Sequence, residues 1–71
     1  MTKYLTPEGL GKFKKELDEL ENVKRKEISE RIRYTAAFGD LKENAAYHEA
    51  KDAQGFLEGR IRELKGIIVG A

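Results

Sequence analysis

Hydrophobic residues recur every three or four positions along two stretches of the chain, which is the spacing of one face of an α-helix. Along the first stretch these residues are Leu10, Phe13, Leu17, Leu20, Ile28 and Ile32. Along the second stretch they are Ala46, Ala50, Ala53, Leu57, Ile61, Leu64 and Ile68. Lys24 occupies the one position of the first stripe where an apolar residue is missing. The pattern predicts two amphipathic helices with mostly charged outer faces.

The first helix has a clear start and a clear end. Thr6 is a good N-cap, and Pro7 then takes the first helical position, where its missing N–H costs nothing. No strong helix breaker follows until Gly39, which suits the left-handed position at a helix C-terminus. We therefore expect a first helix over about residues 7–37.

The second helix is expected to begin directly after that glycine. Asp40 can cap it, and Glu43 stands three residues later, as in a capping box. This predicts a turn over residues 38–40 and a helix over about residues 41–66. Gly55 and Gly59 lie inside this helix on one face, where each costs about 1 kcal/mol relative to alanine. Close approach of another backbone would explain them.

Folding the chain at Gly39 brings the two stripes into register. Ile28 then lies opposite Ala53, and Leu20 lies opposite Ile61. The residue numbers have the same sum in both pairs, as antiparallel pairing requires. The expected fold class is therefore all-α, an antiparallel two-helix coiled-coil hairpin. It would form a thin rod with its turn exposed at the far end.

The last residues, 66–71, are apolar and favour the start of a strand over the end of a helix. An apolar end with nowhere to bury suggests that the chain was cut from a larger protein. We assign residues 1–71 to a single domain of that protein, because 71 residues make one domain at most.

Composition excludes several classes of function. The chain has no cysteine and a single histidine, His48, so disulfides, thiolate chemistry and Cys- or His-rich metal sites are ruled out. It has 14 Lys and Arg against 13 Asp and Glu, and a net charge of +1 gives no bulk attraction to nucleic acid. No apolar run could span a bilayer, and no signal peptide is evident. We therefore expect a cytoplasmic protein with no membrane partner.

The turn holds the strongest candidates for chemistry. Asp40 and Glu43 are three residues apart, so both carboxylates can project from one side of a first helical turn. Ordinary helix capping explains the same pair. Two carboxylates are too few to hold Mg²⁺ firmly, because this ion keeps its waters or takes further ligands from elsewhere. If they bind metal, another molecule must supply the remaining ligands.

Basic and aromatic residues behind the turn allow two interpretations. Arg31 and Lys51 should be neighbours across the hairpin, and Arg33 extends the same flank. This patch could contact a phosphate backbone, although scattered basic groups are usually only solvated. Tyr34 and Tyr47 also fall opposite each other, which favours packing across the hairpin over stacking on a base.

Two long motifs carry a resemblance to a known family. They are Gly39-Asp40-Leu41-Lys42-Glu43-Asn44-Ala45, followed by Tyr47-His48, and Gln54-Gly55-Phe56-Leu57-Glu58-Gly59-Arg60-Ile61. The opening Leu5-Thr6-Pro7-Glu8-Gly9 and the later Lys15-Glu16-Leu17 are also similar. The chain resembles the N-terminal coiled-coil domain of the Gre family of bacterial transcript-cleavage factors, and its GreA-type members in particular. On this resemblance, we expect these 71 residues to lack the family's C-terminal globular domain, which holds the factor on the polymerase.

The resemblance implies a role in transcription elongation. In the family, the coiled coil enters the secondary channel of a backtracked RNA polymerase, and two acidic tip residues help to hold the second Mg²⁺ of the polymerase. The polymerase then cleaves its own extruded RNA. The motif match assigns this role to Asp40 and Glu43, and Arg31, Lys51 and Arg33 are the residues expected to bind the RNA near its 3′ end. The resemblance implies a bacterial, cytoplasmic, DNA-binding transcription protein. It would be an accessory factor and not itself an enzyme.

One departure and two alternatives accompany this interpretation. Many relatives carry an arginine and an acid where this chain has Ala36 and Ala46, which affects polar contacts near the tip but not the two tip acids. The chain could also be a Gre-like regulator that binds the channel without stimulating cleavage, or a purely structural coiled-coil module. In isolation we expect a monomer or weak dimer without tightly bound metal.

Overall fold

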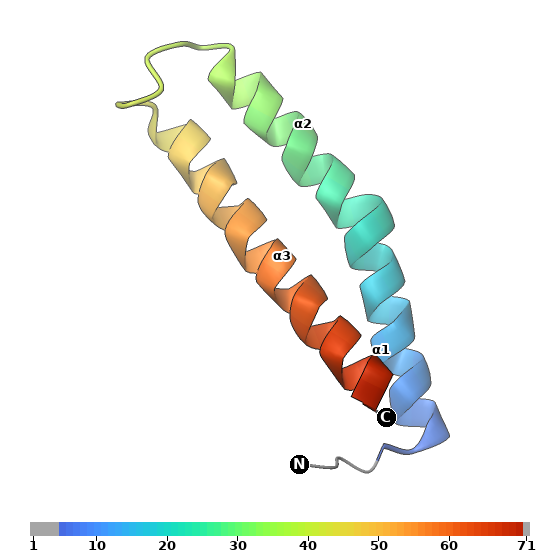
Figure 1. Cartoon of the computed structure of the whole chain (residues 1–71). Helices are drawn as coiled ribbons and strands as arrows, with labels where there is room; N and C mark the ends of the chain where they lie inside the picture. The colour runs from blue at the N-terminus through green and yellow to red at the C-terminus, as the bar shows by residue number, and fades with distance from the viewer. Residues whose placement is uncertain (1–4, 71) are drawn as a thin grey trace.

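Two long helical arms, folded back on each other, make up the computed structural model, which describes residues 5–70 (Figure 1). The first arm runs through α1 (Pro7–Glu19), a π-helical turn η1 (Leu20–Lys24) and α2 (Arg25–Ala36), and the second arm is α3 (Ala45–Gly70). The molecule measures 48 × 23 × 13 Å. No strand occurs within residues 5–70. The predicted all-α antiparallel hairpin is confirmed, with its connecting loop at the end of the rod opposite the start of α1 and the end of α3.

The first arm begins as its sequence predicts. The backbone N–H of Gly9 donates a hydrogen bond of 3.0 Å to the hydroxyl oxygen of Thr6, and Pro7 is the first helical residue. Thr6 is therefore the N-cap of α1, because its side chain satisfies a backbone donor that has no partner inside the helix.

A π-helical turn interrupts the first arm, which the sequence analysis treated as one regular helix. Leu20 and Ile28 are eight residues apart, which in a regular α-helix would turn their side chains about 80° from each other. The N–H of Arg25 instead donates to the carbonyl of Leu20, five residues back. This wider turn absorbs one residue and brings Ile28 to within about 20° of Leu20. Lys24, the gap in the hydrophobic stripe, consequently lies exposed outside the interface.

The buried hydrophobic residues of the described chain lie on the second arm. They are Ala50, Leu57, Ile61 and Leu64. The stripe residues of the first arm, from Leu10 to Ile32, are half-buried against them. One member of the predicted second stripe is wrong, because Ala46 is exposed and the neighbouring Tyr47 is half-buried in its place. Large side chains therefore fill the core toward the termini, and small ones fill it toward the loop.

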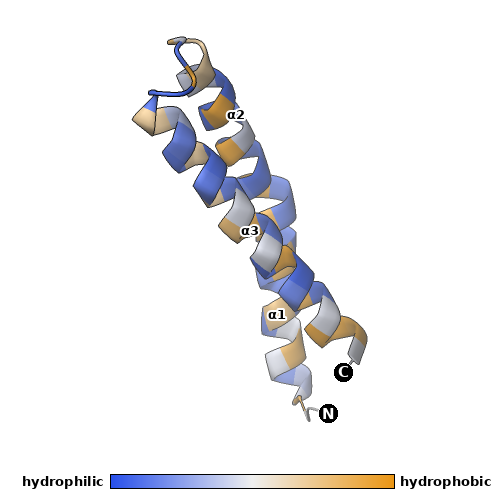
Figure 2. Ribbon diagram, turned by 60° about the vertical axis from the view of Figure 1, so that its left-hand side comes forward, coloured by the Kyte–Doolittle hydropathy of each residue, from blue (hydrophilic) through white to orange (hydrophobic). Residues whose placement is uncertain are grey.

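The second arm is shifted along the chain relative to the prediction. It begins at Ala45 in place of residue 41 and continues to Gly70, beyond the expected end at residue 66. The predicted strand start is wrong for residues 66–70, which are helical, because Ile68 lies four residues after Leu64 and continues the half-buried face. The C-terminal turn is mostly hydrophobic (Figure 2). Ala71 lies outside the described residues.

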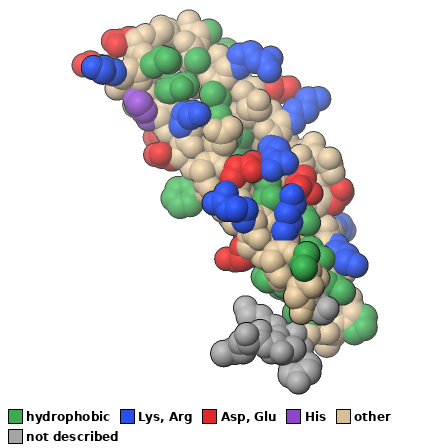
Figure 3. All heavy atoms as spheres, in the orientation of Figure 1, with side chains coloured by type: hydrophobic (Ala, Val, Ile, Leu, Met, Phe, Trp, Pro, Cys, Tyr) green, Lys and Arg blue, Asp and Glu red, His purple; other side chains and the backbone are tan. Residues whose placement is uncertain are grey.

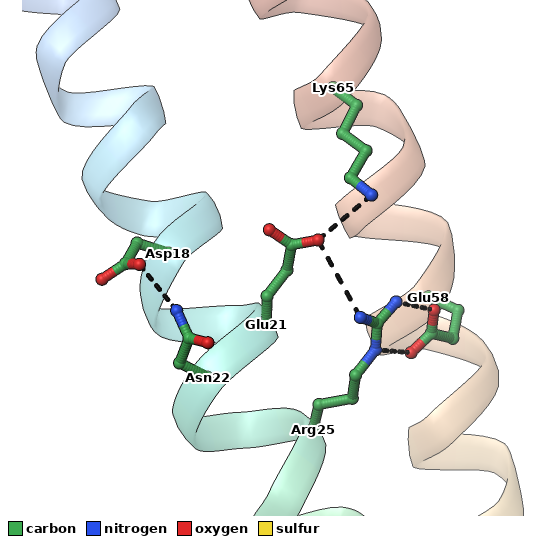
Figure 4. A network of polar contacts seen from close by, with 6 residues as sticks. All are labelled: Asp18, Glu21, Asn22, Arg25, Glu58 and Lys65. Carbon is green, nitrogen blue, oxygen red and sulfur yellow. Dashed lines mark hydrogen bonds and ion pairs between the residues drawn. The ribbon is translucent and has the colours of Figure 1, made fainter.

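Ion pairs clamp the two arms together beside the core (Figure 4). Arg25 on α2 donates two hydrogen bonds, of 2.7 and 2.8 Å, to the carboxylate of Glu58 on α3. Arg60 on α3 donates two, of 2.8 and 3.0 Å, to Glu16 on α1. Paired N–H···O bonds of this kind fix direction as well as distance, so both contacts help to set the register of the hairpin.

These pairs change the acidity of their members. The hydrogen bonds from Arg25 lower the pKa of Glu58, and those from Arg60 lower the pKa of Glu16. The same contacts raise the pKa of both arginines. Lys65 adds a third contact between the arms, with its Nζ 3.1 Å from a carboxylate oxygen of Glu21. These ion pairs therefore help to hold the two arms together.

Gly55 and Gly59 of the second arm do not serve the predicted close approach within this chain. A Cβ added at Gly55 would have no neighbour within 4 Å, and at Gly59 the nearest atom is the Arg62 guanidinium at 3.9 Å. Gly55 lies on the exposed face of α3 beside Phe56, which is 82% exposed. Within the described residues, none of the helices combines the length and apolarity needed to cross a membrane.

Candidate functional site

The loop that joins the arms, residues 37–44, forms the tip of the rod. At its start the last turn of α2 tightens: Phe38 N–H donates to the carbonyl of Thr35 at 3.2 Å, and Gly39 N–H donates to that of Ala36 at 3.1 Å. Gly39 then has a φ of 83°, in the left-handed region. Its predicted role as the residue that ends the first arm is confirmed.

Asp40 also has a left-handed backbone, with a φ of 45°. It is the one non-glycine residue with a positive φ within residues 5–70. This conformation is uncommon outside glycine, although aspartate and asparagine adopt it more readily than other residues. The N–H of Glu43 donates to the carbonyl of Asp40 at 3.0 Å and closes a turn. Both acids are thus carried by a defined loop and not by a helix.

The residue that caps the second arm is Asn44, so the predicted cap at Asp40 is wrong. The N–H of Tyr47 donates to the side-chain oxygen of Asn44 at 3.0 Å, and His48 N–H donates to its carbonyl at 3.1 Å. An N-cap requires an extended backbone, which the left-handed Asp40 does not have. Glu43 therefore precedes α3 and is not the partner in a capping box.

Asn44 also ties the two arms together at the tip. Its side-chain nitrogen donates to the carbonyl of Thr35 at 2.7 Å and, over a longer 3.4 Å, to that of Gly39. Thr35 is itself buried, and its hydroxyl donates to the carbonyls of Arg31 and Ile32. His48 adds a contact of 3.0 Å between its Nε2 and the carbonyl oxygen of Lys42. Sequence analysis missed these contacts, although asparagine directly before Ala45 was a usable cap signal.

The two tip carboxylates take no part in this framework. Asp40 and Glu43 are exposed, and neither side chain forms an ion pair or accepts a hydrogen bond within residues 5–70. The part of the chain that the structure describes also holds no cluster of three potential metal ligands. Carboxylate oxygens suit Mg²⁺, but two of them fill only part of its coordination shell. Any Mg²⁺ held here would need further ligands from another molecule.

The predicted basic flank lies on the surface. Arg31, Arg33 and Lys51 are all exposed, and the Nζ of Lys51 donates to the side-chain oxygen of Gln54 at 3.3 Å. In Figure 3, acidic and basic side chains lie together at the loop end, next to hydrophobic ones. The expected placement of Arg31 and Lys51 as neighbours across the hairpin stays a prediction. Arg25, further down the arm, is engaged with Glu58.

The aromatic residues of the tip do not pair as predicted. Tyr34 is 68% exposed, and its ring packs edge-on against Phe38, four residues later in the loop, at 5.2 Å between ring centres. Tyr47 packs against the ring of His48 at 5.7 Å. The prediction that Tyr34 packs against Tyr47 across the hairpin is therefore wrong. Phe38 and Leu41 are both exposed, as expected of a core that ends before the loop.

Comparison with known proteins gives consistent matches over nearly the whole chain. The family described as "Transcription elongation factor, N-terminal" matches residues 3–71. The transcription elongation factor GreA of Bacillus cereus (strain AH187) is 51% identical over 67 residues, which are 94% of this chain and 42% of that protein. GreA of Acetivibrio thermocellus is 48% identical over the same shares. The chain thus spans less than half the length of these curated relatives. No solved structure matches it.

Proposed function

The chain belongs to the GreA and GreB family of transcription elongation factor N-terminal domains, and from this premise we propose that it stimulates RNA cleavage by bacterial RNA polymerase. In this proposal the hairpin enters the secondary channel of a backtracked polymerase, with its loop foremost. The polymerase carries out the cleavage of its own transcript, and the chain is an accessory factor.

The observation that carries the proposal is the freedom of the tip acids. Asp40 and Glu43 lie at the far end of a rod 48 Å long, on a loop whose order depends on other residues. A helix cap was the main structural explanation for the pair, and Asn44 occupies that position instead. A purely structural coiled-coil module therefore gives no reason for two exposed carboxylates at this point.

The chemistry of the donors fits a metal shared with the polymerase. Asp40 and Glu43 offer hard, anionic oxygens, which are the ligands that Mg²⁺ prefers. When bound, such an ion supplies activation of water and stabilisation of a leaving oxygen in phosphoryl chemistry. The chain would place its two carboxylates beside the reacting phosphate, and the polymerase would supply the other ligands. Near the loop the buried side chains are small, which keeps the two arms narrow and suits their entry into a channel.

Arg31, Arg33 and Lys51 are proposed to contact the RNA near its 3′ end. All three are exposed on the half of the rod next to the loop, and phosphate contacts position a nucleic acid without reading its sequence. Reversing two of these charges, Arg31→Glu with Lys51→Glu, should weaken cleavage more at low salt than at high salt. Equal cleavage by this variant and the parent at both salt concentrations would exclude the contact.

The decisive experiment uses backtracked elongation complexes of a bacterial RNA polymerase with labelled RNA. The parent chain at saturating concentration should shorten the RNA, whereas Asp40→Asn and Glu43→Gln should lose most of this stimulation and recover part of it at higher Mg²⁺. Glu30→Gln, which removes an exposed carboxylate further from the loop, is the matched control and should behave as the parent. Equal cleavage by all four chains would contradict the proposal. A parent chain that slows RNA synthesis without cleavage would identify a channel-binding regulator instead.

A further inference from the structure

A single side chain, that of Asn44, connects three separate parts of the tip. Its oxygen accepts from the N–H of Tyr47 in the first turn of α3. Its nitrogen donates to Thr35 at the end of α2, at 2.7 Å, and over 3.4 Å to Gly39 in the loop. Only an amide side chain of this length offers an acceptor and two donors together. The capping role uses the oxygen alone and leaves the two donor contacts without explanation.

The two donor contacts act on the segment that carries the tip acids. The carbonyl of Gly39 belongs to the peptide unit that leads into Asp40, so its direction is coupled to the left-handed φ of 45° at Asp40. The contact with Thr35 joins the last residue of the loop, Asn44, to the last turn of α2 and so fixes the distance between the two ends of the loop. Glu43 directly precedes Asn44 and is held by the same contact. Both acids thus lie between anchor points that the Asn44 amide holds.

We propose that Asn44 is a positioning residue, whose amide donors hold loop 37–44 in the conformation that presents Asp40 and Glu43. This inference rests on the proposed function of these two acids. The loop is exposed and has little buried apolar area, so side-chain hydrogen bonds carry much of its order. A misplacement of about 1 Å in a catalytic group can cost on the order of 100-fold in rate, so a loose loop would reduce stimulation even with both acids present.

Two substitutions separate the capping role of the Asn44 oxygen from the two hydrogen bonds that its nitrogen donates. Asn44→Asp keeps an oxygen for the N–H of Tyr47 and adds a favourable negative charge at the helix N-terminus, but it removes both donors. Asn44→Ser also keeps a good cap and lacks the amide. Asn44→Ala, which removes cap and donors together, is the comparison for a loss of helix stability. The melting temperatures of the Asp and Ser variants should stay within a few degrees of the parent.

The test combines loop dynamics with cleavage kinetics. In the free chain, NMR relaxation of the backbone amides of residues 40–43 should show increased motion in Asn44→Asp and Asn44→Ser, while residues in the middle of α3 stay unchanged. In backtracked complexes, the maximal cleavage rate should fall by on the order of 10-fold, whereas the half-saturating concentration of the chain should not change. A capping defect alone would not produce this separation.

The outcomes distinguish this inference from the proposed function. If Asp40→Asn loses cleavage while Asn44→Asp and Asn44→Ser retain the parent's maximal rate, the positioning role is overturned and the function of the acids stands. Unchanged relaxation of residues 40–43 in both Asn44 variants would overturn it as well. If all three variants cleave as the parent does, the proposed function fails, and the positioning role fails with it.

Discussion

The half of the hairpin near the termini and the half near the loop are held together by different means. In the base half, Leu57, Ile61 and Leu64 are buried, and the paired hydrogen bonds of Arg60 with Glu16 join the arms beside them. In the tip half the buried residues are Ala50 and Thr35, and the Asn44 amide makes the connection. Glu16 near the base is therefore engaged in structure, whereas the side chains of Asp40 and Glu43 at the tip make no hydrogen bond or ion pair within residues 5–70.

The two halves also differ in what each contact contributes. Apolar burial yields about 25 cal/mol per Å², so leucine and isoleucine stabilise the base far more than alanine stabilises the tip. A typical hydrogen bond contributes only about 1 kcal/mol, but it has a direction. Stability is thus concentrated at the base, and the tip gains a defined loop at little cost in width.

The largest expected effect on stability is at the base core. Leu64 is fully buried, so Leu64→Ala should lower the free energy of unfolding by about 2–4 kcal/mol. Urea denaturation followed by circular dichroism measures this change. Val69→Ala is the matched control, since Val69 is 85% exposed, and it should change stability by less than about 0.5 kcal/mol. Equal effects of the two substitutions would contradict the assignment of Leu64 to the buried core and of Val69 to the surface.

Glycine substitutions at the loop and in the second arm should have opposite signs. Gly55→Ala should raise the free energy of unfolding by about 0.5–1 kcal/mol, because an added Cβ meets no atom within 4 Å and alanine favours the helix. Gly39→Ala should lower it by about 1 kcal/mol, because Gly39 has a φ of 83°. Thermal melts of both variants test the pair. Destabilisation by Gly55→Ala would instead support the prediction that another backbone approaches Gly55 closely.

A smaller effect is expected from acid. The pKa values of Glu16 and Glu58 are lowered in the folded chain by their arginine partners, so their contribution to stability is present above the ordinary value near 4.5. It is lost as the pH falls through the lower, folded-state values. The melting temperature of the parent should therefore fall on acidification below about pH 4.5.

The double variant Glu16→Gln with Glu58→Gln checks the source of that acid sensitivity. It should melt lower than the parent at pH 7 and should show a flatter dependence on pH below 4.5. Glu30→Gln, at an exposed position on the first arm, should leave the profile unchanged. A double variant with the full acid sensitivity of the parent would assign that sensitivity to other groups.

Much of the fold was predictable because it depends on spacing along the chain. The stripes predicted two antiparallel helices, and Thr6 and Gly39 predicted the start and the end of the first arm. The π-turn at Leu20–Lys24 was not predicted, because its only trace was Lys24 in an apolar position. The helical end of α3 was missed because a short apolar run is ambiguous between helix and strand.

The tip shows where sequence reasoning stops. Asp40 and Glu43 satisfied the local spacing of a capping box, and nothing in that spacing reports the left-handed backbone of Asp40. The donor contact of Asn44 depends on Thr35, nine residues earlier, whose carbonyl becomes reachable only after the chain has folded back. The identity of the candidate acids could therefore be predicted, but their independence from the helix could not.

The central claim is that acids at the tip serve function and acids at the base serve structure. Two double variants test it in one experiment, with cleavage in backtracked complexes and melting measured on the same samples: Asp40→Asn with Glu43→Gln, and Glu16→Gln with Glu58→Gln. The tip variant should melt as the parent does, since asparagine tolerates a positive φ at least as well as aspartate, and should lose most of the cleavage. The base variant should melt lower and, below its melting temperature, cleave as the parent does. A tip variant that cleaves normally, or that loses cleavage only in step with unfolding, would contradict the account.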